Sequence, residues 1–324
     1  MVSAEALTIR QAHDDDLPQI LRLLSVSLGW RSDERDADFF RWKHTGNAFG
    51  PSLSWVAADG DRIVGLRAWM RWRFTRGGDI WDAVRGVDTA TDPEYQRRGI
   101  FRSLTLSSLE ALREHSIGHV FNTPNDNSRP GYLKMGWEAV GPLPVSVRFR
   151  SPRAALQALR SRATASAEKW SIPTDIAAPA LEVLADDAAI GALVGSRPDD
   201  GRIRTDFDAD VLRWRYGFGP LCYRGLASDD GIVLFRLRRR GAAVECVVGE
   251  MLAPSVKAER RLVSAVARVT RADQLLRITD DPRQLAGEFP LPGGGPVLTW
   301  RSITHEQMPV LADWKLSMGD IELF

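Results

Sequence analysis

The two halves of the chain repeat each other weakly, and this repeat constrains the fold more than any other feature of the sequence. The segment FFRWKHTGNAFGPSLSWVAADGDRIVGLRAW from Phe39 resembles VLRWRYGFGPLCYRGLASDDGIVLFRLRR from Val211. Each contains an Arg-Trp-basic triplet, a turn with Gly and Pro, and a hairpin pattern. Upstream, the sequence around Leu7 resembles that around Leu181 at nearly the same separation. Two matches at one separation indicate duplication of a domain of about half the chain.

The length of the chain agrees with two domains. With 324 residues and 44% hydrophobic content, it is long enough to bury two cores. We expect the boundary near Pro152, where RAALQALRSRATASAEKW is typical of a connecting helix. The expected domains are therefore residues 1–150 and 151–324. Chance similarity between the halves is the alternative to a duplication.

Strand and helix patterns alternate in the first half. ALTIRQA is typical of a strand, and DDDLPQILRLLSVSL is typical of a helix with Leu17, Ile20, Leu21 and Leu24 on one face. LSWVAADGDRIVGLRAWMRWRF predicts a hairpin that turns near Asp59, and WDAVRGVDTAT and GHVFNTP predict further strands. This organisation indicates a mixed α/β sheet.

Charge and cysteine content exclude several classes of protein. The chain has 43 basic and 42 acidic residues, so no strongly basic face is expected and no nucleic-acid partner. Its two cysteines, Cys222 and Cys246, have no metal or redox spacing and exclude a disulfide scaffold. The segment MVSAEALTIRQAHDDDLPQI lacks the apolar core of a signal peptide or membrane span. We therefore expect a cytoplasmic protein without a membrane partner; its oligomeric state is not predicted.

A glycine and three arginines lie where an extended segment turns into a helix, in DPEYQRRGIFRS. The N-terminus of a helix offers free N–H groups and a partial positive charge, so it binds anions readily. Gly99 would let the backbone approach an anion, and Arg97, Arg98 and Arg102 would add positive charge and forked donors. This pattern predicts a pyrophosphate site. The alternative is a solvated basic turn before a surface helix.

Two motifs together resemble a known family. VDTATDPEYQRRGIFRSL resembles the signature of the GNAT N-acetyltransferase superfamily, in which a loop of the form Q/R-x-x-G-x-G/A opens a helix after the central strand. The matching loop residues are Gln96, Arg97, Arg98, Gly99, Ile100 and Phe101. Phe101 departs from the pattern, which has a small residue there. NTPNDNSRPGYLKMGW resembles the second family motif through Asn125, Tyr132, Gly136 and Trp137, and the resemblance covers about residues 4 to 150.

The resemblance implies the GNAT fold, a mixed and largely antiparallel central sheet flanked by helices. It also implies acetyl-CoA as donor, a small-molecule primary amine as the favoured acceptor, and direct attack by that amine in a ternary complex. Tyr132 matches the family's general acid, with a core aromatic as the alternative. The matching donor contacts are the backbone of Thr89, Ala90 and Thr91 for the pantetheine arm, the loop and Arg102 for the diphosphate, and Asn125 for the arm. Simple capping of a turn is the alternative for Asn125.

The general base is harder to assign. Asp88 lies on the central strand beside the expected acetyl position, so it is the candidate base. The alternative is a water chain, with Asp88 paired to a neighbour such as Arg85. His115 and His119 are four residues apart, but Gly118 is expected to end the helix between them. We therefore expect no metal site.

The second half does not repeat the chemistry. GEMLAPSVKAERRLVSAVARVT predicts a helix but has no glycine between Ala253 and the helix, and no Asn-Tyr-Gly ending follows. This pattern favours a degenerate GNAT-like domain. RLRRR at 236–240 favours a solvated strand edge, and WKLSMGDIELF favours a terminal strand.

Two other functions stay open on the sequence. One is a Fem-type transferase that moves an aminoacyl group from transfer RNA, and the other is a module that senses acyl-CoA without turnover. The acceptor itself is not predicted: an amino sugar, a polyamine, an amino acid and a protein amine all remain open.

Overall fold

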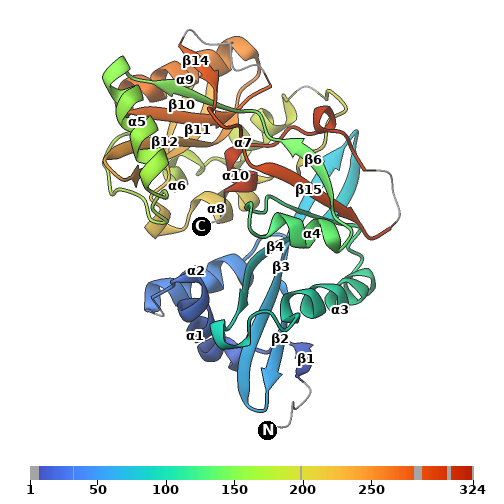
Figure 1. Ribbon diagram of the computed structural model, residues 1–324. Coiled ribbons are helices and arrows are strands. Elements are labelled where there is room, and N and C mark those ends of the chain that lie inside the picture. Colours follow the sequence, from blue (N-terminus) through green and yellow to red (C-terminus); the bar gives the residue numbers. More distant parts are fainter. Residues whose placement is uncertain (1–6, 32, 198, 281–286, 305–307, 323–324) are drawn as a thin grey trace. The chain divides into compact units, whose positions relative to one another are not determined.

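The chain forms two compact units in a computed structural model that describes residues 7–31, 33–197, 199–280, 287–304 and 308–322. The first unit takes residues up to Phe74, Asp79–Gly141 and Val297–Pro309. The second takes Thr75–Gly78, Pro142–Pro296 and residues from Val310 onward. Figure 1 shows both units coloured along the sequence.

The sheet of the first unit has the strand order β1-β2-β3-β4-β5-β15-β6. Strands β1, β2 and β3 pair antiparallel, β4 and β5 pair parallel, and β5 and β15 pair antiparallel. These strands are β1 (Thr8–Gln11), β2 (Leu53–Asp59), β3 (Arg62–Arg76), β4 (Asp79–Thr91), β5 (His119–Asn122), β6 (Glu138–Pro142) and β15 (Val297–Ser302). The predicted mixed, largely antiparallel sheet is confirmed.

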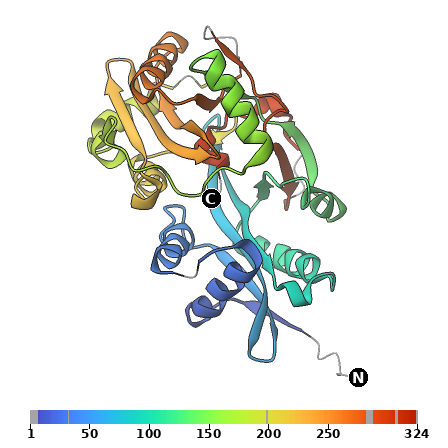
Figure 2. The same ribbon diagram turned by 60° about the vertical axis from the view of Figure 1, so that its left-hand side comes forward.

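Helices cover both faces of this sheet. They are η1 (Asp14–Asp16), α1 (Leu17–Leu28), α2 (Glu34–His44), η2 (Pro93–Tyr95), α3 (Ile100–Glu114) and α4 (Arg129–Lys134). Helices α1 and α2 lie on one side and α3 lies on the other (Figure 1 and Figure 2). Ile20, Leu23 and Leu24 of α1 are buried, so the predicted apolar face of this helix is confirmed in part. Ile100 and Leu104 of α3 pack in the core of the first unit.

The sheet of the second unit has the order β14-β7-β13-β12-β11-β10-β8. Only β12 and β13 pair parallel among the pairings described for this sheet. These strands are β7 (Val145–Phe149), β8 (Ala178–Pro179), β10 (Arg224–Ser228), β11 (Gly231–Arg240), β12 (Ala243–Leu252), β13 (Gln274–Ile278) and β14 (Glu288–Pro290); the unit also holds the short β9 (Arg204–Thr205).

Helix α9 forms the core of the second unit with this sheet. Its residues Leu262 and Val266 cluster with Val233 and Phe235 of β11. The helices of the unit are α5 (Pro152–Thr164), α6 (Ala180–Val183), α7 (Asp187–Gly195), α8 (Ala209–Tyr216), η3 (Gly219–Leu221), α9 (Val256–Thr270), η4 (Leu311–Asp313) and α10 (Met318–Ile321).

The two sheets share one strand order, and each takes one strand from the other half of the chain. In the first sheet β15 lies between β5 and β6, and in the second sheet β7 lies between β13 and β14. Read from β1 and from β8, both sheets run through three strands, a parallel pair, the exchanged strand and an edge strand. The shared order agrees with the duplication indicated by the repeat.

The bounds of the units differ from the predicted division between residues 150 and 151. Strand β7 belongs to the second unit because it pairs with β13 and β14. Helix α5, which follows β7, packs against β12 and β13 and does not act as a linker between the units. The first unit, in turn, needs residues 297–309. A single cut in the sequence therefore cannot separate the two sheets.

Two smaller predictions for the second half are wrong. The arginines of RLRRR lie on β11 between β10 and β12, and Arg236 is buried and ion-paired with Glu322. Arg238 and Arg240 both pair with Glu245, so this strand is not a solvated edge. The end of the chain forms the short helix α10 where a strand was expected.

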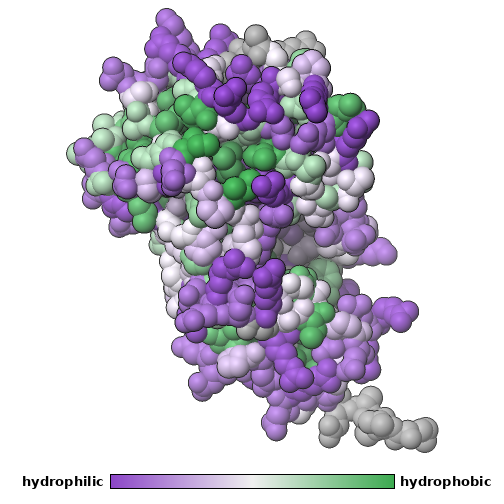
Figure 3. Space-filling model, turned by 90° about the vertical axis from the view of Figure 1, so that its left-hand side faces the viewer, coloured by the Kyte–Doolittle hydropathy of each residue, from purple (hydrophilic) through white to green (hydrophobic). Residues whose placement is uncertain are grey.

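Polar residues dominate the surface seen in Figure 3, and apolar residues gather in its upper part. The most exposed large apolar side chains of α5 are Leu156 and Leu159. Within the described ranges, every helix is too short or too polar to cross a bilayer.

Candidate active site

The two parallel strands at the centre of the first sheet separate toward one end. Pairing of β4 with β5 covers Ala83–Arg85 against His119–Phe121. Strand β4 then continues to Thr91, whereas β5 ends at Asn122. Backbone groups on the β5 side of this stretch of β4 are therefore open to another partner, because buried N–H and C=O groups seek hydrogen bonds.

The predicted pantetheine contacts lie on this open stretch. Thr89 and Thr91 are half-buried and Ala90 is buried. The Thr91 carbonyl already accepts a hydrogen bond from Ser27 of α1, at 3.1 Å. The Thr89 hydroxyl accepts one from Arg67 of β3, at 2.7 Å. A ligand on this strand would therefore meet a segment that is held by α1 through the Thr91 carbonyl and by β3 through the Thr89 side chain.

The N-terminus of α3 is open where the pyrophosphate site was predicted. Gly99 is the N-cap residue, with φ 79° and ψ 6°, in the left-handed region that glycine adopts at little cost. No side chain caps this helix end, and a β-carbon at Gly99 would meet nothing within 4 Å. The first N–H groups of α3 are thus accessible to an anion.

Basic side chains surround this helix end. Gln96, Arg97, Arg98 and Arg102 are all exposed. Arg98 donates to the Glu94 carbonyl at 3.3 Å and lies over the Tyr95 ring. The predicted residues therefore gather positive charge around an open helix N-terminus.

The bulky residue that departs from the family pattern points toward α4. The Phe101 ring packs edge to face against Tyr132, with ring centroids 5.4 Å apart. Its neighbour Ile100 is buried against Gly65, where a β-carbon would be only 2.7 Å from the Ile100 side chain. Helix α3 therefore packs close to β3, and Phe101 helps to hold Tyr132.

Tyr132 is the point where several predicted residues meet. Its ring is buried, and its hydroxyl accepts a hydrogen bond from Arg67 Nη1 at 2.6 Å. The same Arg67 nitrogen donates to Thr89. Arg67 therefore links the candidate general acid to the open stretch of β4.

Arg67 itself is fully buried and was not predicted. Its guanidinium lies 3.7 Å from the centre of the Trp69 ring, and a side chain at Gly86 of β4 would collide with it. Its Nε and Nη2 have no hydrogen-bond partner among the described residues. A buried donor without an acceptor costs about 1–3 kcal/mol. Arg67 is therefore suited to donate to a ligand oxygen. The only signal in the sequence was an arginine inside an apolar strand, VGLRAWM.

Asp88 lies at the centre of a second polar group, which contains the buried Lys43 and His44 and the half-buried Ser52. Its carboxylate is 2.7 Å from Lys43 Nζ and 2.8 Å from His44 Nε2. The other ring nitrogen of His44, Nδ1, is 2.9 Å from the Ser52 hydroxyl. Asp88 thus pairs with two residues of α2 and not with Arg85.

Charges around Asp88 decide its protonation. Burial raises its pKa, but the Lys43 charge and the His44 hydrogen bond outweigh burial and hold the pKa well below its usual range. Asp88 is therefore ionised at neutral pH and is a weak base. Burial lowers the pKa of His44, and Asp88 offsets this only in part, so His44 is neutral at pH 7.

Asn125 lies apart from this cluster, in an exposed turn before α4. Its Oδ1 accepts from the backbone N–H groups of Asn127 and Ser128, at 3.1 and 2.9 Å. The oxygen therefore caps the turn that leads into the helix of Tyr132. This matches the turn-capping alternative and leaves a contact to the donor as a prediction.

His115 and His119, which are four residues apart in the sequence, do not lie on one helix. His115 follows the last residue of α3, and His119 lies on β5 stacked against Trp300. Within the part of the chain that the structure describes, no group of His, Cys, Asp and Glu is arranged to hold a metal ion.

Comparison with known proteins gives a family model and several similar structures. The model, an acetyltransferase (GNAT) domain, matches residues 8–140. A GCN5-related N-acetyltransferase from Kribbella flavida is 18% identical with a TM-score of 0.61, over 92% of this chain and 71% of that chain. One from Anabaena variabilis ATCC 29413 is 12% identical with a TM-score of 0.62, over 92% and 73%. Eis1 from Mycobacterium abscessus is 16% identical with a TM-score of 0.57, over 92% and 74%.

At these identities the structural likeness shows the fold alone. No curated protein matches the sequence.

Proposed function

Because residues 8–140 form a GNAT acetyltransferase domain, and the protein is thus an acyltransferase, we propose that it moves an acetyl group from acetyl-CoA to a primary amine. The observation that carries this proposal is the position of Arg67, which bonds to Thr89 on the open stretch of β4 and to Tyr132. The strand that would hold the thioester and the hydroxyl that would protonate sulfur are thus joined by one side chain.

The donor would bind along β4 and at the start of α3. The open N–H groups behind Gly99 and the exposed Arg97, Arg98 and Arg102 suit a diphosphate. The backbone from Thr89 onward suits the amides of a pantetheine arm. Two unpartnered donors of Arg67 suit the oxygen of the acetyl group, since they lack any other acceptor among the described residues.

Tyr132 would act as the general acid. Its oxygen accepts from Arg67, so its own hydrogen is available to the departing sulfur. The positive guanidinium would stabilise the phenolate that remains. In the reaction a C–N bond forms, the C–S bond breaks, and Tyr132 supplies the proton that converts the thiolate to free CoA. A positioned acid of this kind contributes about 10²- to 10⁴-fold in rate.

His44 replaces Asp88 as the proposed group that takes up the amine proton. The ionised Asp88 accepts from His44 Nε2, which leaves Nδ1 as the acceptor facing Ser52. The half-buried Ser52 hydroxyl would pass the proton of the attacking amine to Nδ1. Asp88 would then stabilise the imidazolium that forms, as a carboxylate does for a catalytic histidine elsewhere.

Release of CoA from acetyl-CoA in the presence of a panel of amines tests the proposal. The panel contains an amino sugar, a polyamine, free amino acids and a peptide amine. We expect CoA release that depends on one class of amine, with acetyl found on its nitrogen by mass spectrometry. Tight acetyl-CoA binding without release would favour an acyl-CoA sensor, and activity that requires charged transfer RNA would favour a Fem-type ligase.

A further inference from the structure

The second unit contains a cavity of about 250 Å³ between the ends of its two parallel strands. Pairing of β12 with β13 stops at Val247 and Leu276. The cavity is lined by the residues that follow, 248–251 on β12 and 277–280 at the end of β13, and by the start of α9. The segments 202–205 and 315–318 close it. It thus occupies the place in the second sheet that the open end of β4 occupies in the first.

This cavity is not built for a diphosphate. The N-cap of α9 is Ser255, whose hydroxyl accepts from the Ala258 N–H at 3.2 Å. Glu259 adds a negative charge in the first turn. The N-terminus of α9 is therefore capped by the side chain of Ser255, whereas that of α3 at Gly99 has no side-chain cap.

One wall of the cavity is acidic. Glu250 is only 8% exposed, and its Oε1 accepts from the Met251 N–H at 2.8 Å. Its Oε2 has no hydrogen-bond partner within the described ranges of the chain. Asp320 lines the same cavity and accepts from Thr205 and from the Ser317 N–H, at 2.6 Å each. Burial and the charge of Asp320 raise the pKa of Glu250 to about 7. A cation bound at Oε2 would relieve both effects.

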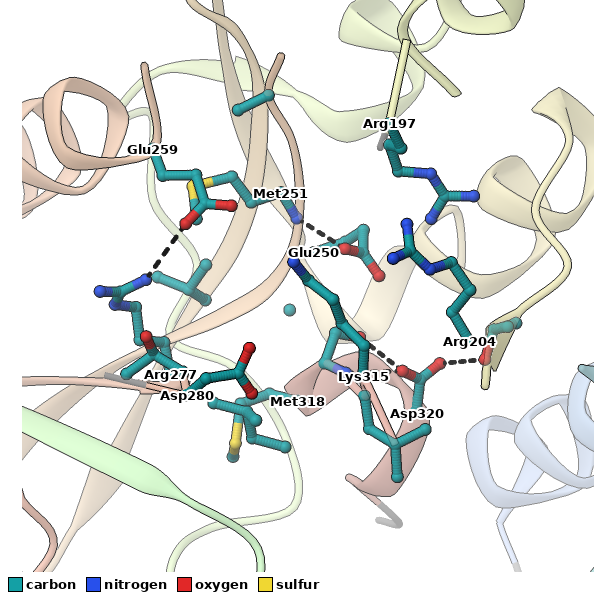
Figure 4. Close-up of a pocket in the computed structure, with 18 of the residues that line it drawn as sticks. Arg197, Arg204, Glu250, Met251, Glu259, Arg277, Asp280, Lys315, Met318 and Asp320 are labelled. Atoms are coloured by element: carbon teal, nitrogen blue, oxygen red, sulfur yellow. Dashed lines mark hydrogen bonds and ion pairs between the residues drawn. The ribbon is translucent and has the colours of Figure 1, made fainter. Parts of the chain in front are cut away.

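Basic side chains also line the cavity. Figure 4 shows Arg197 and Arg204 on one side of the cavity and Lys315 reaching across it. The only side-chain hydrogen bond described for Arg197 is a long one, from Nε to the Val194 carbonyl at 3.4 Å. No ion pair within the described residues involves Lys315, and burial lowers the pKa of Arg197. These two cations are suited to hold an anionic group.

The other charges of the cavity are already matched. Arg277 pairs with Glu288 and lies 3.9 Å from Glu259. Arg202 pairs with Asp280, and Arg204 shares Asp200 with it. The cavity therefore presents one carboxylate oxygen without a hydrogen-bond partner and two cations for which no ion pair is described among the described residues.

We propose that this cavity binds a small zwitterion of the α-amino acid class, with its ammonium group at Glu250 and its carboxylate at Arg197 and Lys315. The volume lies below the roughly 300–1,000 Å³ of pockets for drug-sized ligands, so the ligand is small. A simple anion would leave Glu250 unsatisfied, and a simple amine would leave the cations unmatched. This binding is separate from acyl transfer in the first unit and does not depend on it.

Isothermal titration of the full chain with each proteinogenic L-amino acid tests the proposal. Two matched probes accompany any binder: the amine that lacks its carboxylate, and the N-acetyl derivative that lacks its ammonium group. We expect at least one amino acid to bind, and both probes to bind about tenfold more weakly or worse, since each probe lacks one of the two charge-assisted hydrogen-bonding groups.

Two substitutions locate the site. Glu250→Gln and Arg197→Met should each weaken binding about tenfold or more. Asp230→Asn, which removes a surface ion pair with Arg261 in the same unit, should leave binding unchanged. If one cavity variant fails to fold, the other still decides. Absence of any binder, equal binding of either probe, or unchanged binding in both cavity variants would overturn the proposal.

Discussion

The Arg67 guanidinium donates a hydrogen bond to the Tyr132 hydroxyl across 2.6 Å inside the first unit. This contact joins the middle of β3 to the short helix α4, and a second bond from the same nitrogen reaches Thr89 on β4. Three elements that are far apart in the sequence are thus fixed around one buried cation. The proposed acid chemistry depends on this arrangement, and the first two predictions test it.

Replacing Tyr132 by Phe removes the hydroxyl and keeps the ring that packs against Phe101. We expect kcat to fall by about 10²- to 10⁴-fold with KM for acetyl-CoA nearly unchanged, because the lost interaction develops only as sulfur departs. Steady-state kinetics with saturating amine measures both constants. Unchanged turnover across the whole pH range would mean that Tyr132 only packs.

Replacing Gly86 by Ala tests Arg67 without changing a polar group. The added methyl group would collide with the guanidinium and displace it from Tyr132. We expect a lower kcat and a loss of about 1–3 kcal/mol in the free energy of unfolding, as for overpacked cores. Gly191→Ala in α7 is the matched control, since a β-carbon there meets nothing within 4 Å. A normal kcat in the Gly86→Ala variant would mean that catalysis does not depend on the position of Arg67.

Protonation of His44 predicts how stability and activity change with pH. Its pKa in the folded chain is lowered by burial, so the unfolded chain, with a pKa of about 6.5, binds the proton more readily. The free energy of unfolding should therefore fall as the pH drops below about 6.5. The value of kcat/KM should fall only at a lower pH, because the pKa of His44 in the folded chain is lowered.

The His44→Gln variant tests whether His44 causes this pH dependence. Its unfolding free energy should change less between pH 7 and pH 5 than that of the parent protein, and its activity should be low at every pH. His115→Gln, at an exposed position after α3, is the control and should follow the parent. Equal pH dependence of stability in the His44 variant and the parent would assign the effect to other groups.

The phosphate loop and the fold around it could be predicted because their signals are local. Gly99 adopts the left-handed backbone that its position before a helix requires. The strand before it, β4, is continuous in the sequence from Asp79 to Thr91. The partners of Asp88 could not be predicted from a local signal. Lys43 and His44 lie on α2, whose many charged residues are typical of a helix exposed to solvent. One signal was available: they follow Phe39 and Phe40 by one helical turn, on a buried face.

The exchange of β7 and β15 lay beyond sequence reasoning for a different reason. A strand pattern specifies which face is buried but not which neighbour supplies the hydrogen bonds. The buried arginines of β11 were misassigned because their acid partners, Glu245 and Glu322, are remote in sequence. A run of arginines on a strand therefore predicts a solvated edge only when no acidic residue from elsewhere in the chain pairs with them.

Substituting Gly99 by Glu tests the proposed diphosphate position. The new side chain would bring a negative charge to the open end of α3, and its left-handed backbone would cost about 1–2 kcal/mol. We expect acetyl-CoA binding to be lost in a folded protein, as measured by calorimetry and circular dichroism. Gly99→Asn tolerates the same backbone without the charge and should retain binding. Equal affinity in both variants and the parent would contradict the assignment of the loop.

The number of donor sites follows from the contrast between the two helix ends. Helix α3 starts at a glycine with no side-chain cap, whereas α9 starts at Ser255, whose hydroxyl already occupies one N–H group, with Glu259 in its first turn. Only the first unit should therefore bind acetyl-CoA, and calorimetry on the full chain should give one site per chain. The full chain is needed because a cut at residue 150 would remove β15 from the first sheet. Ser255→Gly should leave the stoichiometry unchanged, because Glu259 still repels a diphosphate. Two equivalent sites, or one site that survives in the Gly99→Glu variant, would place donor binding in the second unit.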